Sequence, residues 1–251
     1  MHPILIEFGS ITIYSYGFFV AAAFLMGLAI AAWQAKLNGL DYSLVPDLGF
    51  YLILGAIVGS RLLYVLIHPE YFWENPLYIL QFWKGGLVFL GGAILSTLIA
   101  LLYLYSKNQS FWAWADVFSP GVAAGQAIGR IGCLMAGCCY GKVCSLPWAI
   151  TFTDPNTLAP AGIPLHPTQL YHSLAGLITF LLLLYFRKKL KYSGFVFALF
   201  CVNRFFLSFV FQNDFIGTIS LIYTFIAPNL FIQNGIVVIK TKGPGIASVA
   251  L

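Results

Sequence analysis

Three arginines, Arg61, Arg130 and Arg204, lie inside long apolar stretches of this sequence. A cation at the centre of a hydrocarbon layer costs about 2.5–3.5 kcal/mol on insertion scales, so an arginine placed there usually has a function. Asp116 is the single acidic residue within these stretches, and about 21 Å of helix would separate it from Arg130. We therefore expect the arginines to bind an anion from elsewhere. A lipid phosphate fits, because its oxygens match the fork of a guanidinium.

Each arginine also has a structural alternative, in which it reaches the headgroup layer or bonds backbone carbonyls. This alternative is strongest for Arg61 and weakest for Arg130, which lies among regularly spaced glycines. Those glycines are Gly121, Gly125, Gly129 and Gly132. Small residues at intervals of three or four form a helix face that a neighbouring helix can approach closely. Such a face also leaves room for a lipid headgroup beside Arg130.

A second group of reactive side chains follows Arg130. It contains the cysteines Cys133, Cys138, Cys139 and Cys144. Metal sites typically use C-x-x-C spacing, which is missing here, so we expect no metal ion. A disulfide from Cys138 or Cys139 to Cys144 and simple apolar packing both remain open. His166, further along, could orient a loop, act as a base or be structural.

The composition defines the elements that must position these residues. Of 251 residues, 60% are hydrophobic and 8% are charged, whereas soluble domains carry about 25% charged residues. We therefore predict an all-α integral membrane protein with about seven spanning helices. The predicted spans are Ile11–Trp33, Leu48–Ile67, Leu87–Tyr105, Phe111–Met135, Leu170–Phe186, Ser193–Phe211 and Ile216–Ile239.

The basic residues predict the orientation of these spans. With the N-terminus outside, eight of the 13 basic residues fall on inner segments, two on outer segments and three within helices. This bias follows the positive-inside rule and predicts an outer N-terminus and a cytoplasmic C-terminus. The net charge of +5 therefore indicates topology, and we expect no nucleic-acid partner. We predict one domain, residues 1–251, with a folded extracytoplasmic cap loop at 136–169 and a short interfacial helix at PLYILQFW.

Several sequence blocks resemble one known family. GRIGCLMAGCCYG, residues 129–141, resembles the signature G-R-x-x-N-F-x-N-x-E-x-x-G of the prolipoprotein diacylglyceryl transferases. The other blocks that resemble family motifs are Tyr16-Gly17, GSRLLYVL at 59–66, WKGGLVFLGG at 83–92, HPTQLYH at 166–172 and Arg204-Phe205. They occur in the family's order, and the resemblance covers about residues 5–214.

The resemblance implies a specific reaction in the bacterial inner membrane. The family moves the diacylglyceryl group of phosphatidylglycerol onto the lipobox cysteine thiol of a prolipoprotein, which forms a thioether and releases glycerol-1-phosphate. It implies no cofactor. By position, the implied catalytic residues are Arg130, Arg204, His166 and Tyr16. The implied phosphatidylglycerol-binding residues are Arg130, Arg204, Arg61, Gly129, Cys133, Gln169 and Tyr171.

This sequence departs from the family pattern at several positions. A family histidine proposed to activate the thiol falls at Leu90, and the signature's asparagine and glutamate fall at Cys133 and Cys138. The histidine is then dispensable here, replaced by another group, or lost in an inactive member. A membrane thiol oxidoreductase and a transporter are the alternative classes. The first would need a C-x-x-C redox pair and the second repeated halves with broken helices, and the sequence has neither.

Overall fold

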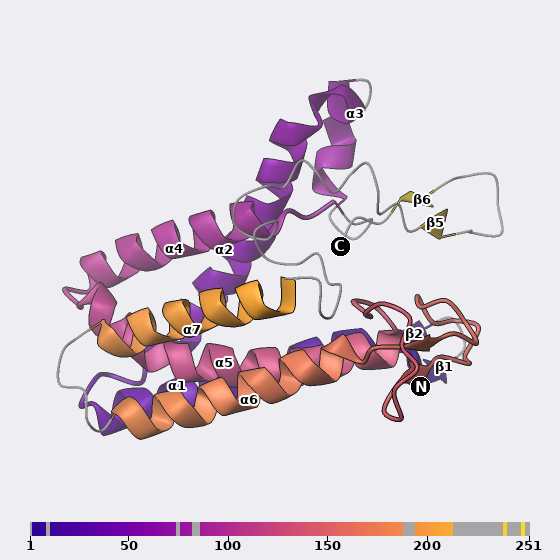
Figure 1. Cartoon of the computed structure of the whole chain (residues 1–251). Helices are drawn as coiled ribbons and strands as arrows, with labels where there is room; N and C mark the ends of the chain where they lie inside the picture. The colour runs from indigo at the N-terminus through magenta and orange to yellow at the C-terminus, as the bar shows by residue number, and fades with distance from the viewer. Residues whose placement is uncertain are drawn as a thin grey trace. The chain divides into compact units, whose positions relative to one another are not determined.

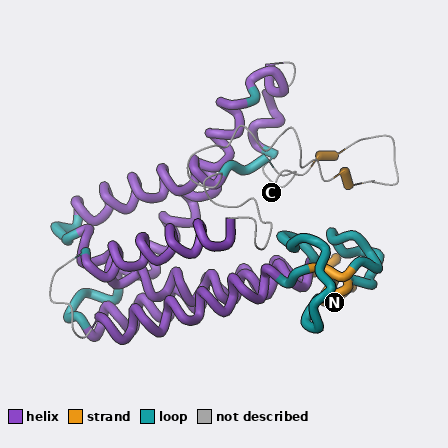
Figure 2. The backbone as a smooth tube through the Cα atoms, in the orientation of Figure 1, coloured by secondary structure: helices purple, strands orange, loops and turns teal. Residues whose placement is uncertain are grey.

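The computed structural model describes residues 2–8, 11–73, 76–81, 86–187 and 194–212, together with the strand residues 238–239 and 247–248. The described chain is mostly helical (Figures 1 and 2). It forms two compact units. The first unit combines Met1–Val45 with Trp112–Ser220, and the second combines Pro46–Phe111 with Leu221–Leu251. Each unit is described by itself below.

Four long helices form most of the first unit. They are α1 (Ser15–Leu37), α5 (Phe111–Ala136), α6 (Thr168–Arg187) and α7 (Phe195–Gln212). α1 and α5 approach closely along a seam of small residues. A Cβ added to Gly121 would lie 2.5 Å from the carbonyl oxygen of Gly27, and one added to Gly125 would lie 3.1 Å from that of Ala23. The predicted close approach of a neighbouring helix to this glycine face is confirmed.

Polar contacts join α6 and α7 to the rest of the unit. The Ser173 hydroxyl donates to the carbonyl of Ala127 on α5 at 2.8 Å, and the Thr179 hydroxyl donates to Asn203 Oδ1 on α7 at 2.6 Å. The carboxylate of Asp116 caps α7, because the backbone N–H of Gly194 donates to it at 2.6 Å and that of Phe197 at 2.8 Å. Asp116 therefore stabilises a helix N-terminus.

The N-terminal segment corrects one expected boundary. The first predicted span begins at Ile11, but β2 (Ile11–Tyr14) pairs antiparallel with β1 (Ile4–Phe8). The alternation of apolar and polar residues in ITIY is typical of a strand. Helix α1 begins at Ser15, whose backbone N–H donates to the carbonyl of Pro3 at 2.9 Å.

The segment between α5 and α6 has a packed interior of its own. Strands β3 (Ile150–Thr151) and β4 (Pro164–Leu165) pair antiparallel. A small apolar cluster fills the space beside them, made of Leu134, Phe152, Ala159 and Leu165, with Ile150 against it. The segment is therefore anchored to the last turn of α5, and it lies at the end of the first unit where β1 and β2 also lie (Figure 1).

The second unit contains α2 (Leu44–Ile67), α3 (Pro69–Trp73), the 3₁₀ helix η1 (Pro76–Leu80) and α4 (Phe89–Ser106). α2 and α4 touch through their backbones, since a Cβ on Gly59 would lie 2.4 Å from the carbonyl oxygen of Gly91. Glycine at these positions is what allows α2 and α4 to approach so closely. The segment PLYILQFW, predicted as a short helix, contains η1.

Four of the described helices, α1, α2, α4 and α6, are long and apolar enough to cross a bilayer. This confirms a helical membrane protein. α5 and α7 coincide with the fourth and sixth predicted spans, but α5 carries both Asp116 and Arg130. The seventh predicted span, 216–239, lies outside the described residues except at its end. There, β5 (Val238–Ile239) pairs with β6 (Ala247–Ser248), so that end is a strand and not a helix.

Candidate active site

Arg130 lies two turns from the end of α5 and is half-buried. Its guanidinium lies near the Cys139 thiol, and its positive charge acts on both Cys139 and Cys133. Tyr16, in the first turn of α1, is close enough to Arg130 and to these cysteines for their charges to act on its hydroxyl. The structure therefore brings together two of the predicted catalytic residues, Arg130 and Tyr16, and the predicted lipid-binding residue Cys133.

The sulfur atoms of Cys133, Cys138 and Cys139 all lie within 4.8 Å of one another. Cys133 projects from the last turns of α5, and the chain then turns at Gly137, which has φ +76°. Cys139 has φ +57°, a conformation uncommon for a residue with a side chain. The missing C-x-x-C spacing therefore does not keep the cysteines apart, because this turn brings Cys138 and Cys139 back to the end of α5, which carries Cys133.

All five cysteines of the chain are free. The disulfide considered between Cys138 or Cys139 and Cys144 is therefore not formed. The Cys144 sulfur instead accepts from the backbone N–H of Leu146 at 3.4 Å. Hydrogen bonds from the thiols of Cys133 and Cys138, together with the Arg130 charge, lower the pKa of the Cys139 thiol. Hydrogen bonding to Cys133 and Cys139, with burial, raises the pKa of the Cys138 thiol.

The first residues of α6 fix the backbone of this cysteine turn. The Gln169 side-chain N–H donates to the carbonyl of Cys138 at 2.7 Å, and the Thr168 hydroxyl donates to that of Cys139 at 2.5 Å. Both donors are fully buried. The Gln169 Oε1 atom is also buried and has no hydrogen-bond partner among the described residues. Gln169, predicted to bind lipid, therefore holds the turn through its amide nitrogen.

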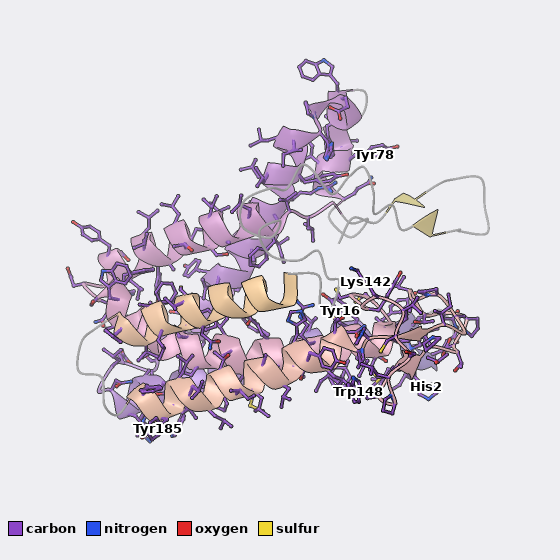
Figure 3. All side chains as sticks on the ribbon, viewed as in Figure 1. His2, Tyr16, Tyr78, Lys142, Trp148 and Tyr185 are labelled. Atoms are coloured by element: carbon purple, nitrogen blue, oxygen red, sulfur yellow. The ribbon has the colours of Figure 1, made fainter. Side chains whose placement is uncertain are left out.

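His166 and Tyr171 belong to a second polar group at the same end of the first unit. His166 Nδ1 lies 3.3 Å from the Tyr171 hydroxyl, and the Trp148 indole N–H donates to that hydroxyl at 2.8 Å. Trp148 was not among the predicted residues, because nothing in its local sequence separates it from other loop aromatics. In Figure 3, Tyr16 and Trp148 lie at one end of the first unit and Tyr185 at the other.

Open space lies beside Arg130. A Cβ added to Gly129 or to Gly17 would meet no atom of the described residues within 4 Å, whereas one added to Gly132 would lie 2.9 Å from the Cβ of Phe19. Gly129 thus departs from the other three glycines of its face, which pack against α1. Among the described residues, the helix surface next to the half-buried arginine leaves room for another molecule.

The contacts of Arg61 differ from those of Arg130, and those of Arg204 are not described. In the second unit, Arg61 Nε donates to the carbonyl of Ile79 at 2.9 Å and Nη1 donates to that of Gly86 at 3.2 Å. Nη2 donates to the carbonyl of Tyr78. The structural alternative for Arg61 is thus realised in these contacts, and lipid binding by Arg61 stays a prediction. Arg204 lies on α7, and its side chain is outside the described residues.

The apolar helices, the half-buried arginine and the cysteine turn define a helical membrane protein with a polar site at one end of a bundle. The family model for prolipoprotein diacylglyceryl transferase matches residues 3–239. The chain belongs to this family.

Curated relatives agree with that assignment. The phosphatidylglycerol–prolipoprotein diacylglyceryl transferase of Clostridium tetani is 34% identical over 228 residues, which is 89% of this chain and 90% of the relative. The enzyme of the same name from Bordetella avium is 34% identical over 87% of this chain and 85% of its own length. That of Aliivibrio fischeri is 37% identical over 84% of this chain and 78% of its own length.

Proposed function

We propose that this chain transfers the diacylglyceryl group of phosphatidylglycerol to prolipoproteins in the bacterial inner membrane. The acceptor is the thiol of the lipobox cysteine. Its sulfur attacks the glyceryl carbon that carries the phosphate ester, the C–O bond breaks, and a thioether and glycerol-1-phosphate result. The family membership over residues 3–239 supports the reaction class, and the site below supports the assignment of residues.

The observation that carries this proposal is the setting of Arg130. It is half-buried on α5, its charge acts on the Cys139 thiol, and a Cβ added to the adjacent Gly129 would meet no atom of the described residues within 4 Å. A guanidinium has five N–H donors, so Arg130 can serve Cys139 and still hold two phosphate oxygens. The leaving phosphate gains charge as the C–O bond breaks, and a fixed cation in a dry site stabilises that charge.

We assign the remaining predicted residues around this centre. Tyr16 lies beside Arg130 and is positioned to contact the headgroup or the incoming thiol. His166 and Tyr171 form a hydrogen-bonded pair in the loop between α5 and α6, and we assign that pair to the acceptor peptide. Arg204 is assigned to the phosphate with Arg130. Binding of the phosphatidylglycerol headgroup by Arg61 stays a prediction.

We further propose that the chain crosses the membrane seven times, with the loop at 136–169 outside and the C-terminus in the cytoplasm. At the end of the first unit opposite that loop, Lys36 lies in the last turn of α1 and Arg187 in the last turn of α6. The Arg187 guanidinium stacks on Trp33 at 5.1 Å. Basic residues at that end support a cytoplasmic position. A reporter active only in the cytoplasm, fused to Leu251, is expected to give signal. A silent but stable fusion would contradict the seven-span topology.

The decisive test of function is mass spectrometry of an acceptor peptide. The purified protein, phosphatidylglycerol vesicles and a lipobox peptide are incubated together, and the peptide is expected to gain one diacylglyceryl group. A peptide with serine in place of the cysteine is the matched control and should gain nothing. Absence of the adduct with properly folded protein would place the chain among inactive family members.

A further inference from the structure

We propose that Cys133, Cys138 and Cys139 bind one Zn²⁺ ion, whose fourth coordination position takes the acceptor thiol. The inference rests on the proposed function for the identity of that thiol. The metal site itself stands on the arrangement of the three cysteines. No other part of the described chain gathers three sulfur, imidazole or carboxylate ligands in this way.

The geometry suits a small thiophilic cation. Tetrahedral zinc has Zn–S distances of about 2.3 Å, which places neighbouring sulfurs about 3.8 Å apart. The three sulfurs already lie within 4.8 Å of one another. Side-chain rotations that move each sulfur by about 1 Å or less would therefore bring them to zinc-binding distance. Three protein ligands and one open position are typical of catalytic zinc, whereas structural sites have four protein ligands. The exposed Cys139 leaves one side of the cluster accessible to a second molecule.

Charge and support also favour this occupant. Three thiolates with a divalent cation carry one net negative charge, and the nearby positive charge of Arg130, which acts on Cys139, balances it. Metal ligands generally need a second layer of hydrogen bonds that holds them in place. Here Gln169 and Thr168 hold the carbonyls of the two adjacent ligands, Cys138 and Cys139. Gly137 provides the turn that returns these residues to Cys133.

The reaction needs what such an ion supplies. The acceptor is a thiol, and the reactive species is its thiolate. The family's histidine position is Leu90 here, which accepts no proton. A thiol that coordinates zinc loses its proton to solvent and remains a nucleophile. The metal-bound thiolate attacks the glyceryl carbon, the C–O electron pair leaves with the phosphate, and the neutral thioether dissociates from the metal. Arg130 then faces the dianionic monoester.

The first test measures metal content. Purified wild-type protein is analysed by elemental mass spectrometry, with about one zinc per chain expected. Cys138→Ser and Cys139→Ser are expected to lose most of it, and Cys201→Ser, at an exposed cysteine on α7 outside the cluster, should retain it. Zinc that is absent from the wild type and does not bind on addition, or that is retained in both cluster variants, overturns the proposal.

The second test asks whether the open position takes a thiol. Co²⁺ is substituted for zinc, and the sulfur-to-cobalt charge-transfer absorption is recorded. Its intensity is expected to rise by about one third when the lipobox peptide binds, because a fourth sulfur joins three. The peptide with serine in place of cysteine should leave the spectrum unchanged. An unchanged spectrum with saturating cysteine peptide would show that the metal does not bind the acceptor thiol, and it would overturn that part of the proposal.

These measurements separate failure of the metal site from failure of the proposed function. Chelation followed by zinc addition is expected to abolish and then restore diacylglyceryl transfer. Full transfer by metal-free protein overturns the metal inference and leaves the function intact. A zinc-loaded protein whose cobalt form responds to the peptide but that transfers nothing would contradict the function and leave the site standing.

Discussion

Arg61 and Arg130 are the same residue type, each on a long helix, yet their surroundings differ. Arg61 donates to three backbone carbonyls, and its guanidinium lies over Tyr64 at 5.6 Å and Phe72 at 5.3 Å. The charge of Arg130 acts on Cys139, and no atom of the described residues lies within 4 Å of a Cβ added at the adjacent Gly129. The first arrangement uses the charge to hold a loop against a helix. The second leaves donors available for a ligand, so burial of an arginine alone does not reveal its role.

Among substitutions at these two arginines, Arg130→Lys is expected to have the largest effect, which is a loss of catalytic rate. Lysine keeps the charge but loses the planar fork, so it cannot bind two phosphate oxygens together. One charge-assisted hydrogen bond is worth about 1.5–3 kcal/mol, which predicts a loss of about ten- to a hundredfold in rate. The measurement is thioether formation per folded protein. Near-normal turnover would return Arg130 to a structural role, like that of Arg61.

Arg61→Lys should show the opposite pattern. Lysine cannot span the carbonyls of Ile79, Gly86 and Tyr78 together, so the second unit is expected to lose about 1–3 kcal/mol of stability. Transfer per folded protein should stay within a few-fold of wild type. Thermal unfolding in detergent measures the first quantity and the peptide assay the second. A large loss of turnover with unchanged unfolding would instead support the predicted lipid-binding role of Arg61.

Two glycines of α5 sharpen the contrast between packing and open space. Gly121→Ala places a Cβ against the backbone of Gly27, so it is expected to destabilise the fold by about 1–3 kcal/mol. Gly129→Ala places a Cβ that meets no atom of the described residues within 4 Å and removes a helix-weakening residue, so the fold should be as stable or slightly more stable. If the headgroup occupies the space at Gly129, the alanine should raise the KM for phosphatidylglycerol severalfold. An unchanged KM would place the lipid elsewhere.

The smallest effect is expected at Leu90. Leu90→His restores the family residue, yet we expect transfer to stay within about twofold of wild type because the thiol is activated in another way. Tyr16 or His166 would accept its proton, or the inferred metal ion would lower its pKa so that the proton is lost to solvent. An inactive wild type that the histidine revives would show that the chain is a degraded family member.

The sequence predicts most helices but not the contacts at their ends. Six of the predicted spans correspond to helices because long apolar runs have few other solutions in lipid. The boundary at Ile11 was wrong because hydropathy outweighed the two-residue alternation of the strand. The hydrogen bonds from Arg61 to three backbone carbonyls could not be predicted, because every residue has a carbonyl and no side chain marks which ones will lie near Arg61. The grouping of Cys133 with Cys138 and Cys139 was missed because spacing along the chain says little once a helix ends in a glycine turn.

The cap that Asp116 places on α7 has a consequence for biosynthesis. The two carboxylate oxygens of Asp116 accept hydrogen bonds from backbone N–H groups that lie 78 and 81 residues further along the chain. While the ribosome is still making α6, α5 holds a carboxylate without that partner, and α5 is not among the helices apolar enough to cross a membrane unaided. Stable insertion of α5 should therefore come late, when α7 emerges. Chains truncated after α6 should expose Asp116 to quality-control proteases, even though Tyr16, Arg130 and the cysteine turn are all present.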